Sequence, residues 1–346
     1  GCWGLFEREN EFLKATRNAK RFMNGIYLGY PLENYLYKLP AETISCIIDD
    51  LLQDNSDKEY TNFADFLEGN FGTTLYNLYF KPYNEKIWNT DLKKVPLDWL
   101  DGKLPMPNVK QIILSNILKK EEGEMVHSTF YYAKKGGSQF IVDRLSENLN
   151  ITAGKTIKNI ERIGDEWMVD GERFDKVIYT GDIRKLGDVL ENAPVEINEA
   201  LVTAKDFLSN GTSNVLCYTD DGDLSWLYFP EKKFIPHRII YTGNFSDTNN
   251  ASERKTCTVE FSGKHNQENM VEELKKMPGN LEPIAFNYEP NSYVINTFET
   301  RQTINKIKAS LQPNGFYLLG RFAEWEYYNM DKCIEAAFKI EEEINA

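Results

Sequence analysis

The sequence contains few of the residues that build metal centres and disulfide frameworks. It has three histidines, which are scattered, and five widely spaced cysteines, an odd number that includes no C-x-x-C pair. Neither a disulfide framework nor a zinc site is therefore implied, and we expect no metal. Unpaired cysteines are usual in a reducing compartment, so we expect a cytoplasmic protein.

Long apolar runs and positive charge are also lacking. No stretch approaches the roughly 18 apolar residues that cross a bilayer, and the chain does not open with a signal-peptide pattern. The formal net charge of −13 argues against non-specific nucleic-acid binding, which needs a basic face. We expect no membrane span and no nucleic-acid partner. A small anionic substrate is still compatible, because a few cations in a pocket set their own local potential.

The glycine-rich G-x-G-x-x-G turn that binds dinucleotides after a strand is absent. The glycines at 1–4 and 69–72 have neither the spacing nor the flanking elements of that motif. The chain also begins at Gly1 rather than at methionine, so we expect a processed product or a piece of a longer protein.

The elements that the pattern does predict alternate between helices and strands. Asn24-Gly25 between two apolar runs indicates a tight hairpin, and residues 40–118 have helical spacing with a break near residues 69–72. Strands are expected within residues 155–181, at 213–219, 224–229, 234–243 and 255–262, as two strands within 283–295, and at 315–319; helices are expected near 267–277 and 299–311. At 346 residues the chain is long enough for two or three domains.

The stretch GRFAEWEYYNMDKCIEAAFKI, residues 320–340, contains the most informative local signal. An apolar run ends at Gly320-Arg321, Asn329 is a preferred N-cap, and apolar residues at helical spacing follow from Met330. The first amides of such a helix have no internal partners and have a partial positive charge. A strand end that is followed by a glycine, an arginine and a helix start could bind a phosphate or a reduced flavin. An ordinary strand-to-helix turn with a surface arginine is the alternative.

This stretch resembles the carboxy-terminal flavin-binding motif of the UDP-galactopyranose mutase family, within the amine oxidase and protoporphyrinogen oxidase superfamily. Gly320, Arg321, Tyr327 and Met330 match by position. Further segments resemble the family in the same order, from about residue 20 to the end: FGTTLYNLYFKPYNEKIWNTD, KKGGSQFIVDRL, KVIYTGDIRKL, FIPHRIIYTGNF and EPNSYVINTFETR.

The resemblance implies an α/β fold with α+β elements. An FAD-binding Rossmann-like domain, incomplete at its amino terminus, would carry a helical insert and an antiparallel-sheet substrate domain. The expected divisions are 1–39 (remnant of the FAD domain and hairpin), 40–125 (helical domain), 126–182 (FAD-binding part), 183–297 (substrate domain) and 298–346 (carboxy-terminal FAD-binding part). We expect that the first few dozen residues of the FAD domain are missing.

The resemblance also implies a site, with FAD as cofactor and a small molecule, such as a UDP-sugar, as substrate. Cofactor-binding residues would be Gly136, Gly137, Thr180, Gly181, Gly320, Arg321, Asn329 and Met330; substrate-binding residues would be Trp88, Lys103 and Trp325; Arg238, Tyr293 and Tyr327 would act on the diphosphate as catalytic residues. A guanidinium suits that role because its planar fork matches phosphate oxygens. A homo-oligomer is left open.

Each assignment has a structural alternative. Arg238 could pair with a neighbouring acid, and Trp88 or the cluster of Trp325, Tyr327 and Tyr328 could simply fill a core. His237 is expected to be a solvated or hydrogen-bonded neighbour rather than a base, and the two glutamates flanking Trp325 are left out of the site.

The chain also departs from the mutase pattern. GKLPMPNV replaces the clamp arginine after the stacking tryptophan, so Lys103 would stand in for it, and Asn291-Ser292-Tyr293-Val294 replaces Pro-Tyr-Tyr-Pro. Two other functions therefore stay open. One is an FAD-dependent amine or protoporphyrinogen-type oxidase or dehydrogenase, and the other is a flavin-free binding module descended from such an enzyme.

Overall fold

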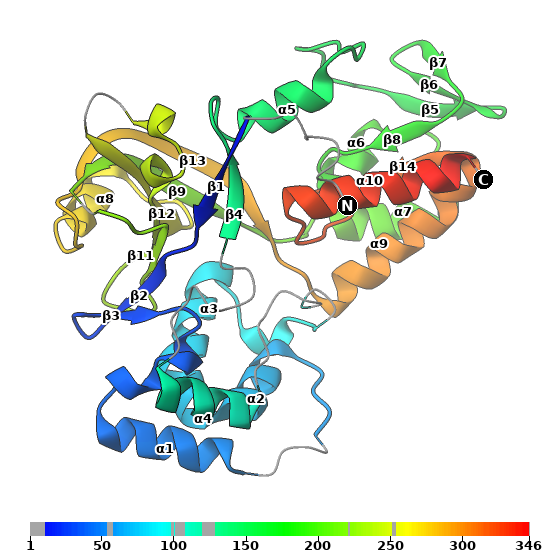
Figure 1. Ribbon diagram of the computed structural model, residues 1–346. Coiled ribbons are helices and arrows are strands. Elements are labelled where there is room, and N and C mark those ends of the chain that lie inside the picture. Colours follow the sequence, from blue (N-terminus) through cyan, green and yellow to red (C-terminus); the bar gives the residue numbers. More distant parts are fainter. Residues whose placement is uncertain are drawn as a thin grey trace. The chain divides into compact units, whose positions relative to one another are not determined.

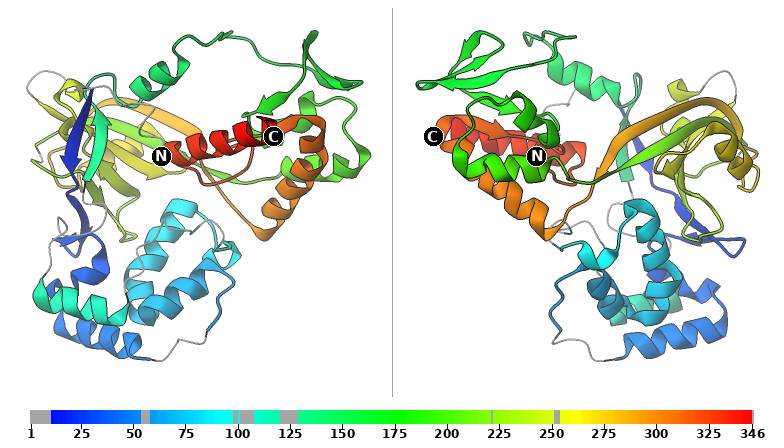
Figure 2. Two further views of the ribbon diagram at one scale, coloured as in Figure 1. Left: turned by 45° about the vertical axis from the view of Figure 1, so that its right-hand side comes forward. Right: turned by 180° about the vertical axis from the view of Figure 1, so that it is seen from behind.

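The computed structural model describes residues 11–53, 58–97, 100, 108–119, 129–220, 222–250 and 254–345. Within that part, the contacts divide the chain into two units (Figures 1 and 2). The C-terminal unit contains residues 148–209 and 293–345, and the N-terminal unit contains residues 11–147 and 210–292. Each unit is described by itself.

In the N-terminal unit, the region predicted to be helical, residues 40–118, forms a group of helices. They are α1 (Ala41–Leu51), α2 (Phe63–Leu75), the π-helical turn η4 (Tyr76–Phe80), α3 (Lys81–Trp88) and α4 (Val109–Leu118), with the 3-10 turns η2 (Leu32–Asn34), η3 (Leu36–Lys38) and η5 (Leu92–Lys94). Asn62 caps α2 by accepting the amide of Asp65, and Asn108 forms a capping box with Gln111. The predicted break is at Gly72, whose φ of 80° and ψ of 157° lie outside the helical region.

A seven-stranded sheet in the same unit has the order β13-β9-β12-β11-β10-β2-β3. Its strands are β13 (Glu282–Val294), β9 (Ser209–Thr219), β12 (Lys255–Ser262), β11 (Pro236–Ile240), β10 (Trp226–Tyr228), β2 (Ala19–Met23) and β3 (Ile26–Gly29). Helix α8 (Gln267–Leu274) contributes Met270 and Leu274 to the core on this sheet. The predicted hairpin joins β2 to β3, because Asn24 and Gly25 both have the positive φ (51° and 77°) that a type I′ turn requires.

A two-stranded ladder and a short helix complete this unit. Strand β1 (Phe12–Thr16) pairs antiparallel with β4 (Thr129–Ala133), and α5 (Gln139–Ser146) follows β4. Short 3-10 turns, η9 (Thr242–Asn244) and η10 (Asp247–Asn249), follow β11.

The C-terminal unit is built around a parallel strand pair. Strands β8 (Val177–Tyr179) and β14 (Phe316–Leu318) run side by side, and β5 (Ile160–Ile163), β6 (Glu166–Val169) and β7 (Glu172–Phe174) form a small antiparallel sheet. The helices are α6 (Leu186–Val189), α7 (Val195–Ala204), α9 (Phe298–Leu311) and α10 (Met330–Asn345), with turns η8 (Ile183–Lys185) and η11 (Gln312–Asn314). Their shared core includes Trp167, Ile304, Phe316 and Trp325.

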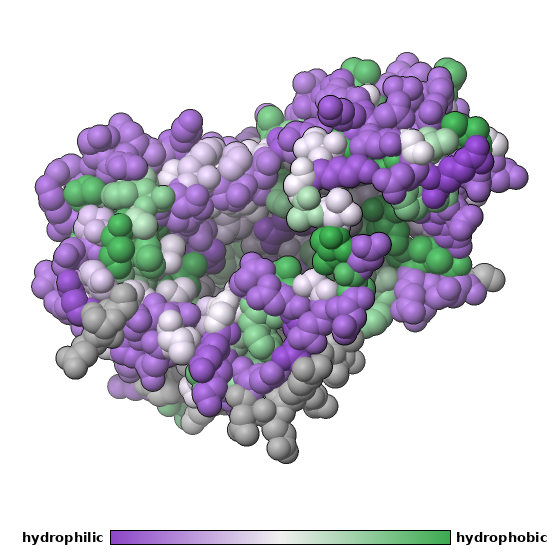
Figure 3. Space-filling model, turned by 90° about the horizontal axis from the view of Figure 1, so that it is seen from above, coloured by the Kyte–Doolittle hydropathy of each residue, from purple (hydrophilic) through white to green (hydrophobic). Residues whose placement is uncertain are grey.

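The α/β class predicted from the sequence is confirmed, and most predicted elements are present. One prediction is wrong: residues 283–295 form a single long strand, β13, rather than two. The five predicted domain divisions stay a prediction. No helix in the described ranges is both long and apolar enough to cross a bilayer. On the face drawn in Figure 3, apolar residues lie in small groups among hydrophilic ones.

Candidate functional site

Two predicted cofactor segments meet at the carboxyl ends of the parallel strand pair. Thr180-Gly181 follows β8 and Gly320-Arg321 follows β14. The segments are held in register because Leu319 donates its amide to the carbonyl of Tyr179 at 3.0 Å, and Ile183 donates to the carbonyl of Phe322 at 3.1 Å. In open α/β sheets ligands bind at this edge of the strands. We call residues 179–183 and 318–330 the strand-end cradle.

Gly320 provides the accessible backbone of the cradle. Its φ is 92°, which a residue with a Cβ rarely adopts, and a Cβ built there would have no atom of the described residues within 4 Å. The Gly320 amide donates to Glu324 Oε2 at 2.8 Å, and the other oxygen of this buried carboxylate accepts from Lys308 Nζ at 2.6 Å. The glycine therefore leaves open space beside a loop that is itself firmly held.

Arg321 organises the loop that leads into α10. Its Nε donates to the carbonyl of Tyr328 at 2.8 Å, and its Nη2 donates to the same oxygen. The guanidinium also lies 5.1 Å from the ring centre of Tyr327. Tyr327 in turn stacks on Tyr293, with centroids 5.8 Å apart and an interplanar angle of 17°. Three residues predicted for the site, Arg321, Tyr327 and Tyr293, therefore contact one another in sequence and form a row.

Helix α10 begins at Met330, as predicted, and its first turn is accessible. The Cys333 amide donates to the carbonyl of Asn329 at 3.0 Å, which places Asn329 at the N-cap position. Asn329 and Asp331 are exposed, and Met330 is 52% exposed. The amides of the first turn have no intrahelical partner, so this end of the helix suits an electron-rich group.

Two ionisable groups near this helix start, the Cys333 thiol and the Tyr328 phenol, stay neutral at ordinary pH. Burial raises the pKa of the Cys333 thiol. Burial also raises the pKa of the Tyr328 phenol, and the negative charges of Glu324 and Glu326 raise it further. Neither group therefore adds a negative charge where the amides of α10 would meet a ligand.

Trp325, predicted to bind substrate, is buried in the core of the C-terminal unit. It is 1% exposed, its Nε1 donates to the carbonyl of Ile295 at 3.2 Å, and its ring lies 5.4 Å from Phe207. Its φ of 51° is unusual for a bulky residue. These contacts fit the packing role that was the alternative interpretation.

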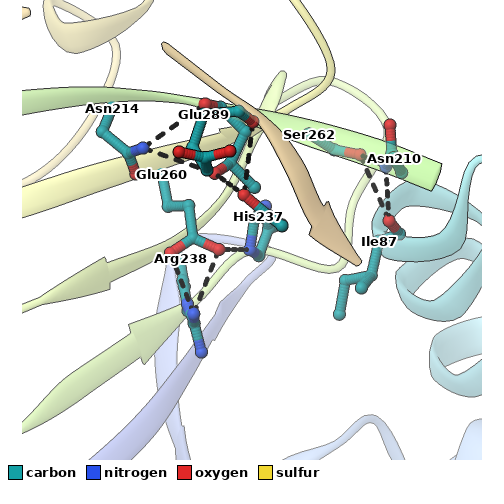
Figure 4. A network of polar contacts seen from close by, with 10 residues as sticks. Ile87, Asn210, Asn214, His237, Arg238, Glu260, Ser262 and Glu289 are labelled. Atoms are coloured by element: carbon teal, nitrogen blue, oxygen red, sulfur yellow. Dashed lines mark hydrogen bonds and ion pairs between the residues drawn. The ribbon is translucent and has the colours of Figure 1, made fainter. Parts of the chain in front are cut away.

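Arg238 lies on β11 of the N-terminal unit and pairs with an acid on the next strand. Its Nη2 donates to both carboxylate oxygens of Glu260, at 2.8 and 3.0 Å (Figure 4). His237 Nε2 lies 2.9 Å from Glu260 Oε1. Although burial opposes it, the hydrogen bond from His237 and the charge of Arg238 lower the pKa of Glu260 to about 2. Because that carboxylate is ionised and only accepts, the His237 Nε2 bears the proton.

Trp88 ends α3 and is 5% exposed, so only a small part of the indole is accessible. Asn210 fixes this helix end to the sheet, because its Nδ2 donates to the carbonyl of Ile87 and to Ser262 Oγ, both at 2.6 Å (Figure 4).

The other predicted residues are less informative. Gly136 and Gly137 form the turn between β4 and α5, with φ of 79° and 58°. They lie in the N-terminal unit, whereas the strand-end cradle lies in the other. Lys103 lies outside the described residues. Where the chain is described, no group of three or more His, Cys, Asp or Glu could hold a metal.

Sequence reasoning missed a concentration of positive charge around Tyr228 on β10. Arg17, Arg21 and Arg238 all favour its phenolate, although burial is the larger effect and raises its pKa. The guanidinium of Arg17 lies 3.9 Å from the ring centre of Tyr30, and that of Arg21 lies 4.4 Å from it. The sequence did contain a signal for this. Alternate side chains of β2 are buried, and Arg21 lies on the buried face together with Ala19 and Met23.

Comparisons with known proteins agree on the fold. No model of a known protein family matches the chain. A reduced UDP-galactopyranose mutase is similar in structure, with a TM-score of 0.81 and 17% identity over 92% of this chain and 74% of that one. A protein from Exiguobacterium sp. 255-15 assigned as a protoporphyrinogen oxidase has a TM-score of 0.70 and 12% identity, over 99% of this chain and 83% of its own.

Cyclohexylamine oxidase from Brevibacterium oxydans is a third similar structure. Its TM-score is 0.59 at 11% identity, over 97% of this chain and 83% of that one. At such identities a structural likeness shows the fold alone. The resemblance predicted from the sequence is therefore confirmed as a shared fold: this chain folds like a UDP-galactopyranose mutase, a protoporphyrinogen oxidase and an amine oxidase.

Proposed function

We propose that the chain functions as an FAD-dependent enzyme that acts on an anionic small molecule, with a sugar nucleotide as the favoured substrate class. The observation that carries the proposal is the strand-end cradle, where Gly320 faces open space and the first turn of α10 is exposed. This edge of the parallel strand pair is where ligands bind in α/β folds.

The residues of the cradle fit a flavin ring. The first amides of α10 would donate to the electron-rich pyrimidine edge, and their partial positive charge would favour the reduced, anionic form. Gly320 would allow the ring close to the backbone, since no side chain in the described ranges occupies that space. Arg321 would position the α10 entrance through the Tyr328 carbonyl. When bound, the flavin would supply the redox or nucleophilic chemistry, and the protein supplies orientation and charge.

The row formed by Arg321, Tyr327 and Tyr293 would position the substrate next to the ring. Two stacked phenols offer hydroxyl donors at fixed spacing, and such groups can hold a diphosphate without a metal. In the N-terminal unit, Arg238 would add a cation whose orientation Glu260 fixes. Trp88 and Lys103 stay proposals for the nucleobase end, whereas the burial of Trp325 leads us to give it a packing role.

A sugar nucleotide is favoured over an amine because of charge. The positive charges of Arg17, Arg21 and Arg238 all act on the phenol of Tyr228, in a chain whose formal net charge is −13. An oxidase that removes hydride from a neutral or cationic amine would gain nothing from such a cluster, whereas a diphosphate would. The arginine cluster is thus the feature that separates the two enzyme hypotheses.

The test is the effect of UDP on the FAD-loaded, dithionite-reduced protein. We expect UDP to raise the midpoint of thermal unfolding and to perturb the absorbance of the reduced flavin, with uridine giving a smaller effect because it lacks the diphosphate. The Arg238→Gln variant should weaken the response to UDP by about tenfold or more, since a charge-assisted hydrogen bond is lost. Arg173→Gln, an exposed arginine, is the control.

Two outcomes would contradict parts of the proposal. If reduced protein ignores UDP, and amines reduce the flavin of the oxidised protein in the absence of oxygen, the oxidase alternative replaces the sugar-nucleotide assignment. If UDP binds although no flavin can be loaded, the flavin-free binding module replaces both.

A further inference from the structure

The loop between β10 and β11 closes around a lysine of helix α3. Strand β10 ends at Tyr228 and β11 begins at Pro236, and the loop and the helix both belong to the N-terminal unit. The ammonium of Lys86 lies within hydrogen-bond distance of four backbone carbonyls of this segment, those of Phe229, Glu231, Phe234 and Pro236. We call the four carbonyls the Lys86 cage.

The ammonium of Lys86 has enough N–H groups for three short bonds to the cage, because an ammonium has three donors and no acceptor. Burial lowers the pKa of Lys86 to about 8, although the charges of Glu231 and Glu273 act in the other direction, so the group is still mostly protonated at about pH 7. Its Nζ lies 2.6 Å from the carbonyl oxygen of Phe229, 2.7 Å from that of Phe234 and 2.9 Å from that of Glu231, with that of Pro236 at 3.5 Å.

Converging carbonyls need a positive charge at their centre. Their oxygens have partial negative charges that repel one another, and the segment has few donors of its own, since Pro230 and Pro236 lack an N–H. Rings of backbone carbonyls are also what replaces the water around a potassium ion in channels. Lys86 therefore takes the place that a bound cation would otherwise fill.

The closed loop fixes the residues on either side of it. Tyr228 and Arg238 are direct partners in the β10–β11 ladder, so the loop closes next to both. The register of β11 against β12 shifts just before Arg238, and such an irregularity redirects side chains; here His237 and Arg238 both reach Glu260. Through the cage, Lys86 ties this turn of the chain to helix α3.

We propose that Lys86 is a positioning residue, whose ammonium acts as a built-in cation that closes the β10–β11 loop and thereby sets the orientation of Arg238. No contact with a substrate is assigned to Lys86. The closure of the loop is independent of the proposed function, whereas its effect on the binding of a diphosphate rests on that function.

Chemical rescue of Lys86→Ala tests the closure on the full chain at about pH 7. The substitution removes Cγ, Cδ, Cε and Nζ, which n-propylammonium replaces atom for atom, whereas 1-propanol fills the same space without a charge. We expect the backbone amides of residues 229–240 to exchange with deuterium about tenfold faster in the variant. Propylammonium should restore the wild-type rate, and 1-propanol should not.

Lys232→Ala is the matched control, because it removes an exposed lysine from the same loop and should exchange like the wild type. Unchanged exchange in Lys86→Ala, rescue by neither additive, or equal rescue by both would overturn the proposal. If Lys86→Ala does not fold, refolding with each additive decides instead. Recovery with propylammonium alone is expected, and any other result overturns the proposal.

The response to UDP separates the positioning of Arg238 from a merely structural role. In the FAD-loaded, reduced protein, Lys86→Ala should weaken the response to UDP about tenfold and leave that to uridine unchanged, since Arg238 is proposed to act on the diphosphate. Propylammonium should restore it. A rescued exchange rate with an unchanged response to UDP would overturn the positioning role. If the wild type itself ignores UDP, the proposed function fails, and the exchange measurement still decides the closure of the loop.

Discussion

Glu260→Ala is expected to lower the free energy of unfolding by about 3–5 kcal/mol, because it leaves two buried or partly buried partners without their acceptor. His237 is fully buried and donates to Glu260, and Arg238 donates to both carboxylate oxygens. The His237 Nδ1 already has no partner among the described residues, so the ring cannot find a second acceptor on that side. Urea denaturation followed by circular dichroism measures the change.

The ion pair of Glu282 with Arg254 provides the matched control. Both side chains are exposed, and their N···O distance is 2.6 Å. Surface pairs of this kind contribute about 0–1 kcal/mol, so Glu282→Ala should change stability by no more than that. If Glu260→Ala were as mild as its control, then Glu260 would not hold Arg238 in place. The role of that arginine in orienting a diphosphate would lose its structural basis.

Trp325→Ala is expected to be equally severe, with a loss of about 3–5 kcal/mol, because it opens a large cavity in the core of the C-terminal unit. The indole packs against Phe207, and the guanidinium of Arg184 lies 5.0 Å from its ring. Its Nε1 also satisfies the carbonyl of Ile295. Trp325→Phe, which keeps a ring but loses that donor, should have an intermediate effect.

The same measurement separates packing from substrate binding at Trp325. Phe298→Ala removes an exposed aromatic ring from the same unit and should cost less than about 1 kcal/mol. A Trp325→Ala protein with near wild-type stability and weakened UDP binding would contradict the packing role, and would restore the assignment made from the sequence.

Local signals in the sequence were enough for several elements. Asn24-Gly25 predicts the β2–β3 hairpin, because its positive φ values are set by the two residues themselves. The strand before Gly320 and the start of α10 at Met330 follow from an apolar run and a capping residue. By contrast, Pro290-Asn291 suggests a turn inside β13 that does not form. Strand β13 lies at the edge of its sheet, where a proline need not donate to a neighbour.

The site was harder to predict, because its geometry depends on partners that are distant in the sequence. Glu260 reaches Arg238 only through the register between β11 and β12. Trp325 stands in a loop that looks polar, yet the charges beside it are used by α9: Glu324 pairs with Lys308, and Glu326 pairs with Arg301. These pairs draw the loop onto the helix and bury the tryptophan between them. No periodicity in the sequence reveals such a pairing.

The central claim is that the strand-end cradle holds a flavin, and the difference absorption spectrum of FAD titrated with the purified chain tests it most directly. We predict a saturable shift of the visible flavin bands for the wild type. Arg321→Ala should need about tenfold more protein for the same shift, because the Tyr328 carbonyl and the α10 entrance are no longer held. Arg173→Ala, which changes an exposed arginine of the same unit, should match the wild type. A spectrum of FAD that stays that of the free cofactor at all protein concentrations, or a shift that Arg321→Ala leaves unchanged, would contradict the claim.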